Sequence, residues 1–272
     1  MATQEQIAKQ LLANRIEIEN SAISMINTEI ERTFRKLLDL GYAEDAKAYM
    51  FRFSDMSNKS ISELKKILSY LRTYIYMVAT HSMQSAIDIV ENEYGISEHL
   101  VAEEFANKEQ FGKTTKERIG IYVNHFKFEA ESWIAAGLVL GLKKYDVTKE
   151  FKTYANKPYA NPVFREASKL ESKASRLKRG APNFGIGKYT SAVNAITRLE
   201  RGLVGEMYRQ TQILAWNANT SVVGYRVARG SSFPCQLCDD MVGFHKDSID
   251  LPSYHLNCRC IVWPVYSNEE GF

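Results

Sequence analysis

All four cysteines of this chain lie in one short stretch near its C-terminal end, between Cys235 and Cys260, and the residues before Cys235 contain none. Cysteines that act only as small core hydrophobes would be scattered through the sequence. A cluster of cysteines with His255 at short spacing is what a metal site or a local disulfide clip requires. This stretch therefore constrains the fold and the function more than any other.

The spacing within the cluster favours a tetrahedral metal site. Cys235-x-x-Cys238 is the spacing of a zinc knuckle, in which a tight turn aims both sulfurs at one ion. His255-x-x-Cys258 supplies a second pair, and Cys260 is a fifth candidate because residues two apart in a strand share a face. The predicted sets are three cysteines with His255, or four cysteines with His255 outside the ligand set. Four protein ligands leave no open position, so the Zn²⁺ would be structural. One or two disulfides, or free thiols, are the alternatives.

The overall composition is that of an ordinary globular protein. Hydrophobic residues make up 45% of the 272 residues and charged residues 25%, and the net charge of +3 is too small to indicate a nucleic-acid binder by itself. The N-terminus has neither the basic nor the apolar region of a signal peptide. The longest apolar run, 133–142, is about half of the ~20 residues that span a bilayer. We expect synthesis in the cytoplasm, where clustered cysteines more often hold metal than form disulfides.

Apolar residues in the first half recur at steps of three and four, which predicts long amphipathic helices. The first helix is expected to extend from Ile7 to a stop at Gly41, the second to begin at a Ser60–Glu63 capping box and end at Gly95, and the third to begin at a Thr114–Glu117 box. The apolar positions of these helices are Ile23, Ile26, Ile30, Phe34 and Leu37, then Leu64, Ile67, Leu71, Ile75 and Val78, then Ile119, Val123, Phe126, Ala130 and Trp133.

The predicted fold class is mainly α, with an N-terminal bundle of long helices and a small C-terminal α+β Cys/His module that resembles a zinc knuckle. We place the helical domain at 1–155, a basic hinge containing Pro and Gly at 156–189, and the module at 190–272. The isolated histidines of the helical part are interpreted as surface or hydrogen-bonded residues; they are His81, His99 and His125. Loss of a structural metal, as in Cys258→Ser, is expected to unfold the tail and leave the helical half intact.

Lysine and arginine dominate the hinge. We favour a solvated linker as the interpretation of these charges, and non-specific contact with nucleic-acid phosphates is the alternative. The candidate phosphate-contacting residues are Lys169, Lys173, Arg176, Lys178, Arg179 and Lys188.

The module is predicted as a helix over 189–221, a strand over 225–229, a Cys-rich turn, an irregular loop and a strand over 258–263 that Pro264 stops. Asp239, Asp240 and His245 follow the first cysteine pair. They form either a polar turn before Gly243 or the acid–base group of a metal-dependent nuclease.

The order of residues in the module resembles the C-terminal domain of the phage Mu F-like family, the minor head or head-morphogenesis proteins of tailed phages. The similarity covers roughly residues 185–265, and the helical first half resembles those proteins only in being helical. It rests on Tyr208-Arg209, Val222-Val-Gly224-Tyr-Arg-Val227, Cys235-Gln-Leu-Cys238-Asp239, Gly243, Pro252-Ser-Tyr-His255-Leu-Asn-Cys258-Arg-Cys260 and Pro264.

Two departures from the family pattern lean away from catalysis. Ser231-Ser232-Phe233 stands where the family often has an acidic residue and a basic or polar pair, and Thr211-Gln212 stands where a Thr-Glu pair is common. If that glutamate has a chemical role in the family, this chain lacks it.

The resemblance implies a protein that sits inside the capsid near the portal in a few copies and takes part in head assembly or DNA packaging. Its expected partners are the portal protein or other head proteins, with packaged DNA as a non-specific contact and no membrane. Its expected location is the host cytoplasm during assembly and then the virion. No catalytic residues are assigned. A nuclease or toxin-like effector built on the Cys/His module is the second hypothesis, and a zinc-bearing DNA-binding regulator is the third.

Overall fold

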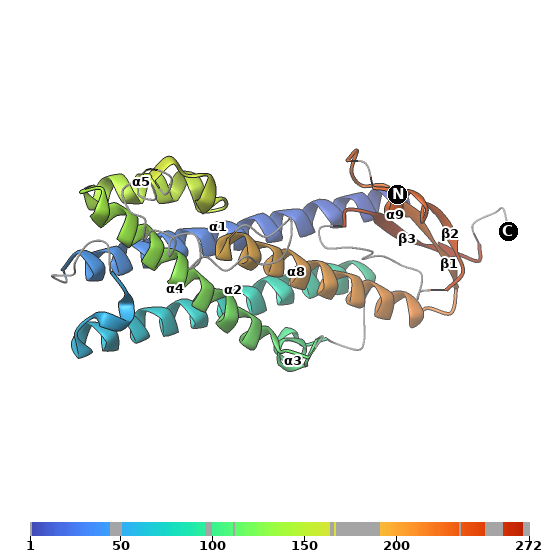
Figure 1. Cartoon of the computed structure of the whole chain (residues 1–272). Coiled ribbons are helices and arrows are strands. Elements are labelled where there is room, and N and C mark those ends of the chain that lie inside the picture. Colours follow the sequence, from blue (N-terminus) through green and yellow to red (C-terminus); the bar gives the residue numbers. More distant parts are fainter. Residues whose placement is uncertain are drawn as a thin grey trace. The chain divides into compact units, whose positions relative to one another are not determined.

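The computed structural model describes residues 2–43, 51–95, 100–110, 112–163, 166, 191–233, 235–247 and 258–268. Long helices make up most of these ranges, and a small antiparallel sheet forms the C-terminal part (Figure 1). This confirms the predicted fold class. Within the described ranges no helix is long and apolar enough to cross a membrane. The elements are α1 (Gln4–Ala43), η2 (Phe53–Asp55), α2 (Asn58–Tyr94), α3 (Ala102–Asn107), α4 (Thr115–Val139), α5 (Lys144–Tyr154), η3 (Pro158–Ala160), α8 (Ala192–Asn217), β1 (Val222–Ala228), α9 (Gln236–Asp239), β2 (Gly243–His245) and β3 (Ile261–Tyr266).

The chain forms two compact units, each assembled from segments that are distant in sequence. Unit 1 comprises Met1–Ile23, Val78–Ala106 and Arg198–Phe272, and unit 2 comprises Ser24–Met77 and Asn107–Thr197. The predicted domains follow the sequence without interruption, whereas α1, α2 and α8 each contribute residues to both units. The C-terminal module therefore shares unit 1 with two segments of the predicted helical domain.

The predicted stop of the first helix at Gly41 is wrong, because α1 continues to Ala43. The glycine serves packing instead of termination. A Cβ on Gly41 would lie 2.7 Å from Cγ2 of Ile134 and 3.0 Å from the ring of Phe51. Gly41 therefore lets α4 approach α1 more closely than any other residue type would allow.

The predicted start of α2 is wrong, whereas its predicted end and the predicted start of α4 are confirmed. The second helix begins before its predicted box, because the hydroxyl of Ser57 accepts from the N–H of Ser60 at 3.3 Å and takes the capping role. Its end is confirmed at Gly95, which has a positive φ of 65°. The capping box of α4 is also confirmed: Thr114 Oγ1 accepts from the Glu117 N–H at 3.2 Å, and Glu117 Oε2 accepts from the Thr114 N–H at 2.8 Å.

Aromatic residues hold the helices of unit 2 together. Phe34 of α1 stacks on Phe151 of α5 with ring centroids 3.9 Å apart, and Trp133 of α4 packs edge-on against both rings. All three side chains are buried. Burial of each ring contributes on the order of 2 kcal/mol relative to exposure, so this cluster fixes how α1, α4 and α5 pack.

The buried carboxyl group of Glu129 accepts a hydrogen bond from the first turn of α8 in unit 2. Glu129 of α4 accepts from the N–H of Ala192 at 2.8 Å, while the hydroxyl of Ser191 accepts from the N–H of Asn194 at 3.1 Å. These bonds satisfy backbone donors that a helix N-terminus leaves free. Burial raises the pKa of Glu129 to about 8, although the hydrogen bond from Ala192 acts in the opposite direction.

Unit 1 has an apolar core that leads directly to the sheet. Leu11 of α1, Val90 of α2 and Val204 of α8 belong to one buried cluster. Further along, Trp216 of α8 packs against Tyr225 of β1 with ring centroids 5.5 Å apart. The Trp216 cluster also includes three of the four cysteines, so the cysteine stretch is part of the core of this unit.

The sheet has the order β2-β1-β3, and both pairings are antiparallel. The predicted strand over 225–229 is confirmed in position as β1, but β2 is an additional short strand within the predicted irregular loop. The prediction that Pro264 stops the last strand is wrong: it lies inside β3, opposite Tyr225. An edge strand tolerates proline because half of its N–H groups point away from the sheet.

Candidate metal centre

The first half of the centre is a short turn fixed by Arg229, which follows the end of β1. The guanidinium of Arg229 donates to the carbonyl oxygens of Cys235 at 3.3 Å and Ser231 at 3.2 Å, and also to that of Phe233. It forms an ion pair with Asp239 of α9 as well. The turn is thereby closed before α9 begins, and α9 places Cys238 in the core.

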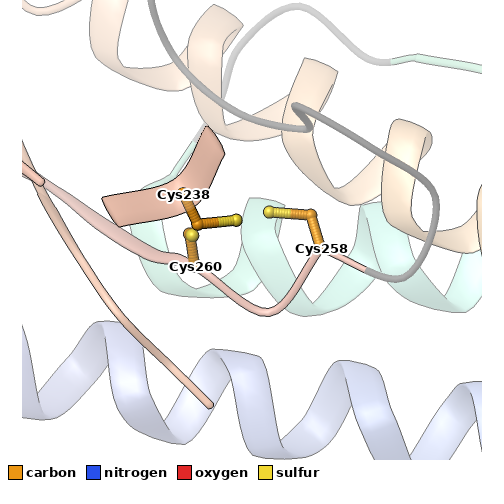
Figure 2. A group of neighbouring side chains, drawn as sticks. All are labelled: Cys238, Cys258 and Cys260. Atoms are coloured by element: carbon orange, nitrogen blue, oxygen red, sulfur yellow. The ribbon is translucent and has the colours of Figure 1, made fainter. Parts of the chain in front are cut away.

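The second half is the segment that leads into β3. Cys258 and Cys260 are both buried there, at 5% and 3% exposure, as Cys238 is at 3%. The sulfurs of the three cysteines all lie within 4.8 Å of one another, and Figure 2 shows them pointing toward a common centre. Among the described residues this is the only group of three or more Cys, His, Asp or Glu side chains with that geometry.

The donor set fits a metal ion. Tetrahedral zinc bound through sulfur at ~2.3 Å needs sulfurs about 3.8 Å apart, which is compatible with the observed upper limit. Burial and the neighbouring cysteines raise the pKa of Cys238 to about 11, and the pKa of Cys260 is also raised, chiefly by its hydrogen bond with Cys258 and by burial. Crowded buried thiols resist ionisation without a cation, and a bound divalent ion reverses that preference. The four cysteines all lie among the described residues, and no disulfide joins any of them.

The remaining predicted ligands stand differently. Cys235 is partly buried, packs against the same core and hydrogen-bonds with Cys238, but it does not belong to the group within 4.8 Å. His255 lies outside the described residues. The structure thus brings together three of the five predicted ligands, and Cys235 and His255 stay the predicted candidates for the fourth position.

A pocket of about 70 Å³ adjoins the centre. Cys235, Cys238 and Cys260 line it together with Arg229 and Arg259. Its lining therefore includes residues from both halves of the centre.

The residues of the nuclease hypothesis, Asp239, Asp240 and His245, do not bring three ligand atoms within 4.8 Å of one another. Asp239 is engaged by Arg229, and Nε2 of His245 lies 2.9 Å from the carbonyl oxygen of Met241. Asp240 is exposed.

The other predicted residues either do not belong to the cysteine group or lie outside the described residues. His81 is exposed, and burial lowers the pKa of the half-buried His125. Residues outside the described ranges are His99 and the six basic residues predicted to contact phosphate, Lys169, Lys173, Arg176, Lys178, Arg179 and Lys188.

Sequence reasoning missed Arg15 and Glu19, two buried α1 residues that reach the second half of the centre. Nη2 of Arg15 donates to the carbonyl oxygen of Cys258 at 2.8 Å, and Glu19 pairs with Arg259 at 2.7 Å. A signal was present: both charges are in phase with the apolar positions Leu11, Leu12 and Ala22, where a solvated residue is not expected.

A second buried polar group lies on α8. Gln212 accepts from Nη1 of Arg209 at 2.6 Å and donates to the hydroxyl of Tyr208 at 3.0 Å. The side chain of Gln212 therefore bridges two neighbours of its own helix. Both residues of the Thr211-Gln212 pair are buried.

Comparisons of the chain with protein-family models, with curated proteins and with solved structures gave no match.

Proposed function

We propose that this chain is a minor head protein of a tailed phage or prophage, and that its cysteine cluster holds a structural zinc ion. The observation that carries the proposal is the convergence of Cys238, Cys258 and Cys260 in the core of unit 1. These residues belong to the ordered series from Cys235 to Pro264 on which the family resemblance rests.

Zinc is favoured by the chemistry of the donors. Three buried thiols select a soft or borderline cation over Mg²⁺ or Ca²⁺, which prefer oxygen ligands. With Cys235 or His255 in the fourth position the ion has no open coordination site, which suits a structural role.

A bound ion would add to the stability of the module. Its sheet consists of only a seven-residue, a three-residue and a six-residue strand, and it depends on packing against Trp216 of α8 for its buried face. An ion bound by Cys238 and by the Cys258–Cys260 segment would tie the two ends of the loop between them. Metal binding energy would then contribute directly to folding.

Native mass spectrometry of the untagged chain tests the metal. We expect one zinc per chain, lost when Cys238→Ser or Cys258→Ser is introduced. Comparing Cys235→Ser with His255→Ala identifies the fourth ligand, and His245→Ala is the matched control that should retain zinc. A wild-type chain that binds no metal in zinc-containing buffer contradicts the proposed centre.

The head function requires a test in particles. Targeted mass spectrometry of purified virions from the phage or prophage that encodes the chain should detect it at low copy number. Deletion of its gene should yield defective heads or heads without DNA. Normal DNA-filled heads after deletion, together with absence of the chain from virions, would contradict the assignment.

The nuclease or effector hypothesis has its own test. If the chain has a nuclease activity that disappears in the triple variant Asp239→Ala, Asp240→Ala, His245→Ala while the zinc is retained, the enzyme hypothesis replaces the structural one. Asp239 and His245 are engaged by Arg229 and by a backbone carbonyl, so their arrangement adds no support to that hypothesis.

A further inference from the structure

The ligand segment Cys258–Cys260 is held by side chains of α1, more than two hundred residues earlier in the chain. Arg15 donates through Nη2 to the carbonyl oxygen of Cys258 at 2.8 Å. Its Nε lies 3.2 Å from Oε1 of Glu19, and the other carboxylate oxygen of Glu19 lies 2.7 Å from Nη2 of Arg259. Glu19 is thus placed between an arginine of its own helix and the arginine that separates the two cysteines.

This ion cluster differs from an ordinary surface pair. The side chains of Arg15 and Glu19 are only 3% and 2% exposed, whereas the Glu5–Lys9 pair on the same helix is 47% and 57% exposed. Exposed pairs contribute little to stability. Buried charges are costly unless they are paired and hydrogen-bonded, and here the ligand segment supplies part of that pairing through Arg259 and the carbonyl oxygen of Cys258.

Apolar contacts continue the same face of α1. Ala8 and Leu12 form a buried cluster with Ile261, the first residue of β3. Ala8, Leu12, Arg15 and Glu19 are spaced four, three and four apart, so they share one face of the helix. A Cβ on Gly230 would lie 1.8 Å from the carbonyl oxygen of Arg259 and 2.9 Å from Leu12, so the loop after β1 also packs tightly here.

The cluster has a charge that suits a metal–thiolate centre. Two guanidinium groups and the carboxylate of Glu19 leave one net positive charge at the backbone of Cys258. The pKa of Glu200, which also interacts with Glu19, is raised to about 7 by burial, so that carboxyl group adds little negative charge below that pH. Zinc with three thiolates and a histidine carries a charge of about −1, and with four thiolates about −2. A buried positive charge offsets part of either.

We infer that Arg15 and Glu19 are positioning residues of the metal centre: they fix the Cys258–Cys260 segment against α1, and the guanidinium groups of Arg15 and Arg259 provide counter-charge for the bound thiolates. This inference rests on the proposed zinc site. It adds two side chains of α1, far away in sequence, that increase the affinity of that site for the metal. It makes α1 part of the centre and the ion a link between the N-terminal helix and the C-terminal sheet within unit 1.

The test is a Co²⁺ titration of the full-length chain, followed by the thiolate-to-cobalt charge-transfer absorption and the ligand-field bands. We expect Arg15→Gln to lower the Co²⁺ affinity about 10- to 100-fold, as loss of supporting contacts does at other metal sites. Glu19→Gln should lower it by a smaller factor, because it releases Arg259 but also removes a negative charge near the thiolates. Arg15→Lys should recover part of the affinity because it keeps the charge but loses the planar fork. The matched controls on the exposed face of α1 are Lys9→Gln and Glu17→Gln, and both should bind like the wild type.

The outcomes separate this inference from the proposal on which it depends. A wild-type chain that binds no Co²⁺ through thiolates overturns the metal centre itself. A wild-type chain that binds Co²⁺, with Arg15→Gln and Glu19→Gln indistinguishable from the controls, leaves the centre standing and overturns the role of α1.

A measurement on the unmutated chain covers the case in which a variant fails to fold. Because coupling is reciprocal, metal binding should slow hydrogen exchange in the α1 segment 4–19 as well as in the sheet. The α2 segment 58–77, which belongs to unit 2, is the internal control and should not change. Equal exchange of segment 4–19 with and without bound Zn²⁺ would contradict the inference.

Discussion

Replacing Glu129 with glutamine should change how the stability of unit 2 depends on pH. The folded chain holds this carboxyl group buried, with a pKa of about 8 against an ordinary value of 4.5. Folding therefore favours the protonated form. The contribution of Glu129 to the stability of unit 2 is greatest below about pH 4.5, decreases as the pH rises toward 8, and levels off above that value.

The size of the effect follows from the difference between the two pKa values. Each unit corresponds to about 1.4 kcal/mol, so ionisation of Glu129 costs roughly 4 to 5 kcal/mol across the whole interval. Glutamine cannot ionise, and its carbonyl oxygen can still accept from the N–H of Ala192, although its amide group introduces buried donors. We expect the variant to be slightly less stable than the wild type at low pH and several kcal/mol more stable near pH 8, so the two stability curves cross.

The assay is urea unfolding at several pH values, with limited proteolysis read by mass spectrometry of α4 peptides so that only unit 2 is followed. The pKa of Glu131 in the same helix is also raised by burial, so the stability of the variant should still decrease as the pH rises. The decrease should correspond to about one proton fewer than in the wild type. Glu109→Gln, at an exposed position, is the control. If the stability of Glu129→Gln falls as steeply with pH as that of the wild type, Glu129 does not fold in its protonated form.

Three further predictions concern the metal, the sheet and the hinge. Cys258→Ser should loosen all of unit 1, including segments 4–23 and 78–95, and not the C-terminal tail alone, because these segments share its core; hydrogen exchange confined to 258–268 would contradict this. Gly224→Ala should destabilise unit 1 by about 1–3 kcal/mol in urea unfolding, because the added Cβ would lie 2.3 Å from the ring of Phe244. The control is Gly120→Ala in α4, where the added Cβ meets no neighbour within 4 Å, and it should stabilise unit 2 by about 0.5–1 kcal/mol. If the hinge contacts DNA phosphates, changing its six basic residues to glutamine should lower the slope of log affinity against log salt by up to about 5; an unchanged slope would favour the solvated linker.

The helical part of the fold could be predicted from the sequence because its signals are local. The steps of three and four along α1 and the Thr114–Glu117 box depend on residues within a few turns of one another, and both are confirmed. Predictions failed where a residue serves a distant partner. Gly41 is a residue type that commonly ends helices, but here its lack of a side chain leaves room for Ile134 and Phe51. Pro264 lies within a strand because β3 is at the edge of the sheet.

The cysteines of the candidate site could also be predicted from the sequence, because their spacing is a local signal. The cysteine spacing is local and chemically distinctive, so Cys238, Cys258 and Cys260 could be named in advance, and the structure brings their sulfurs together. Arg229, Arg15 and Glu19 carry no such spacing. The phase of Arg15 and Glu19 with the apolar positions of α1 indicates that they are buried, but only the structure shows that they contact the ligand segment.

The sequence by itself therefore determined that this chain is mainly helical and that its only cysteines gather in a C-terminal module able to hold a metal ion. Tertiary structure alone decided that the module shares a core with the first turns of α1 and with part of α2, and that a buried Arg15–Glu19 pair reaches the ligand segment. The physical reason is that periodicity, caps and ligand spacing are encoded within a few residues. Contacts across more than two hundred residues depend on which apolar faces pack together, and no local pattern specifies that choice.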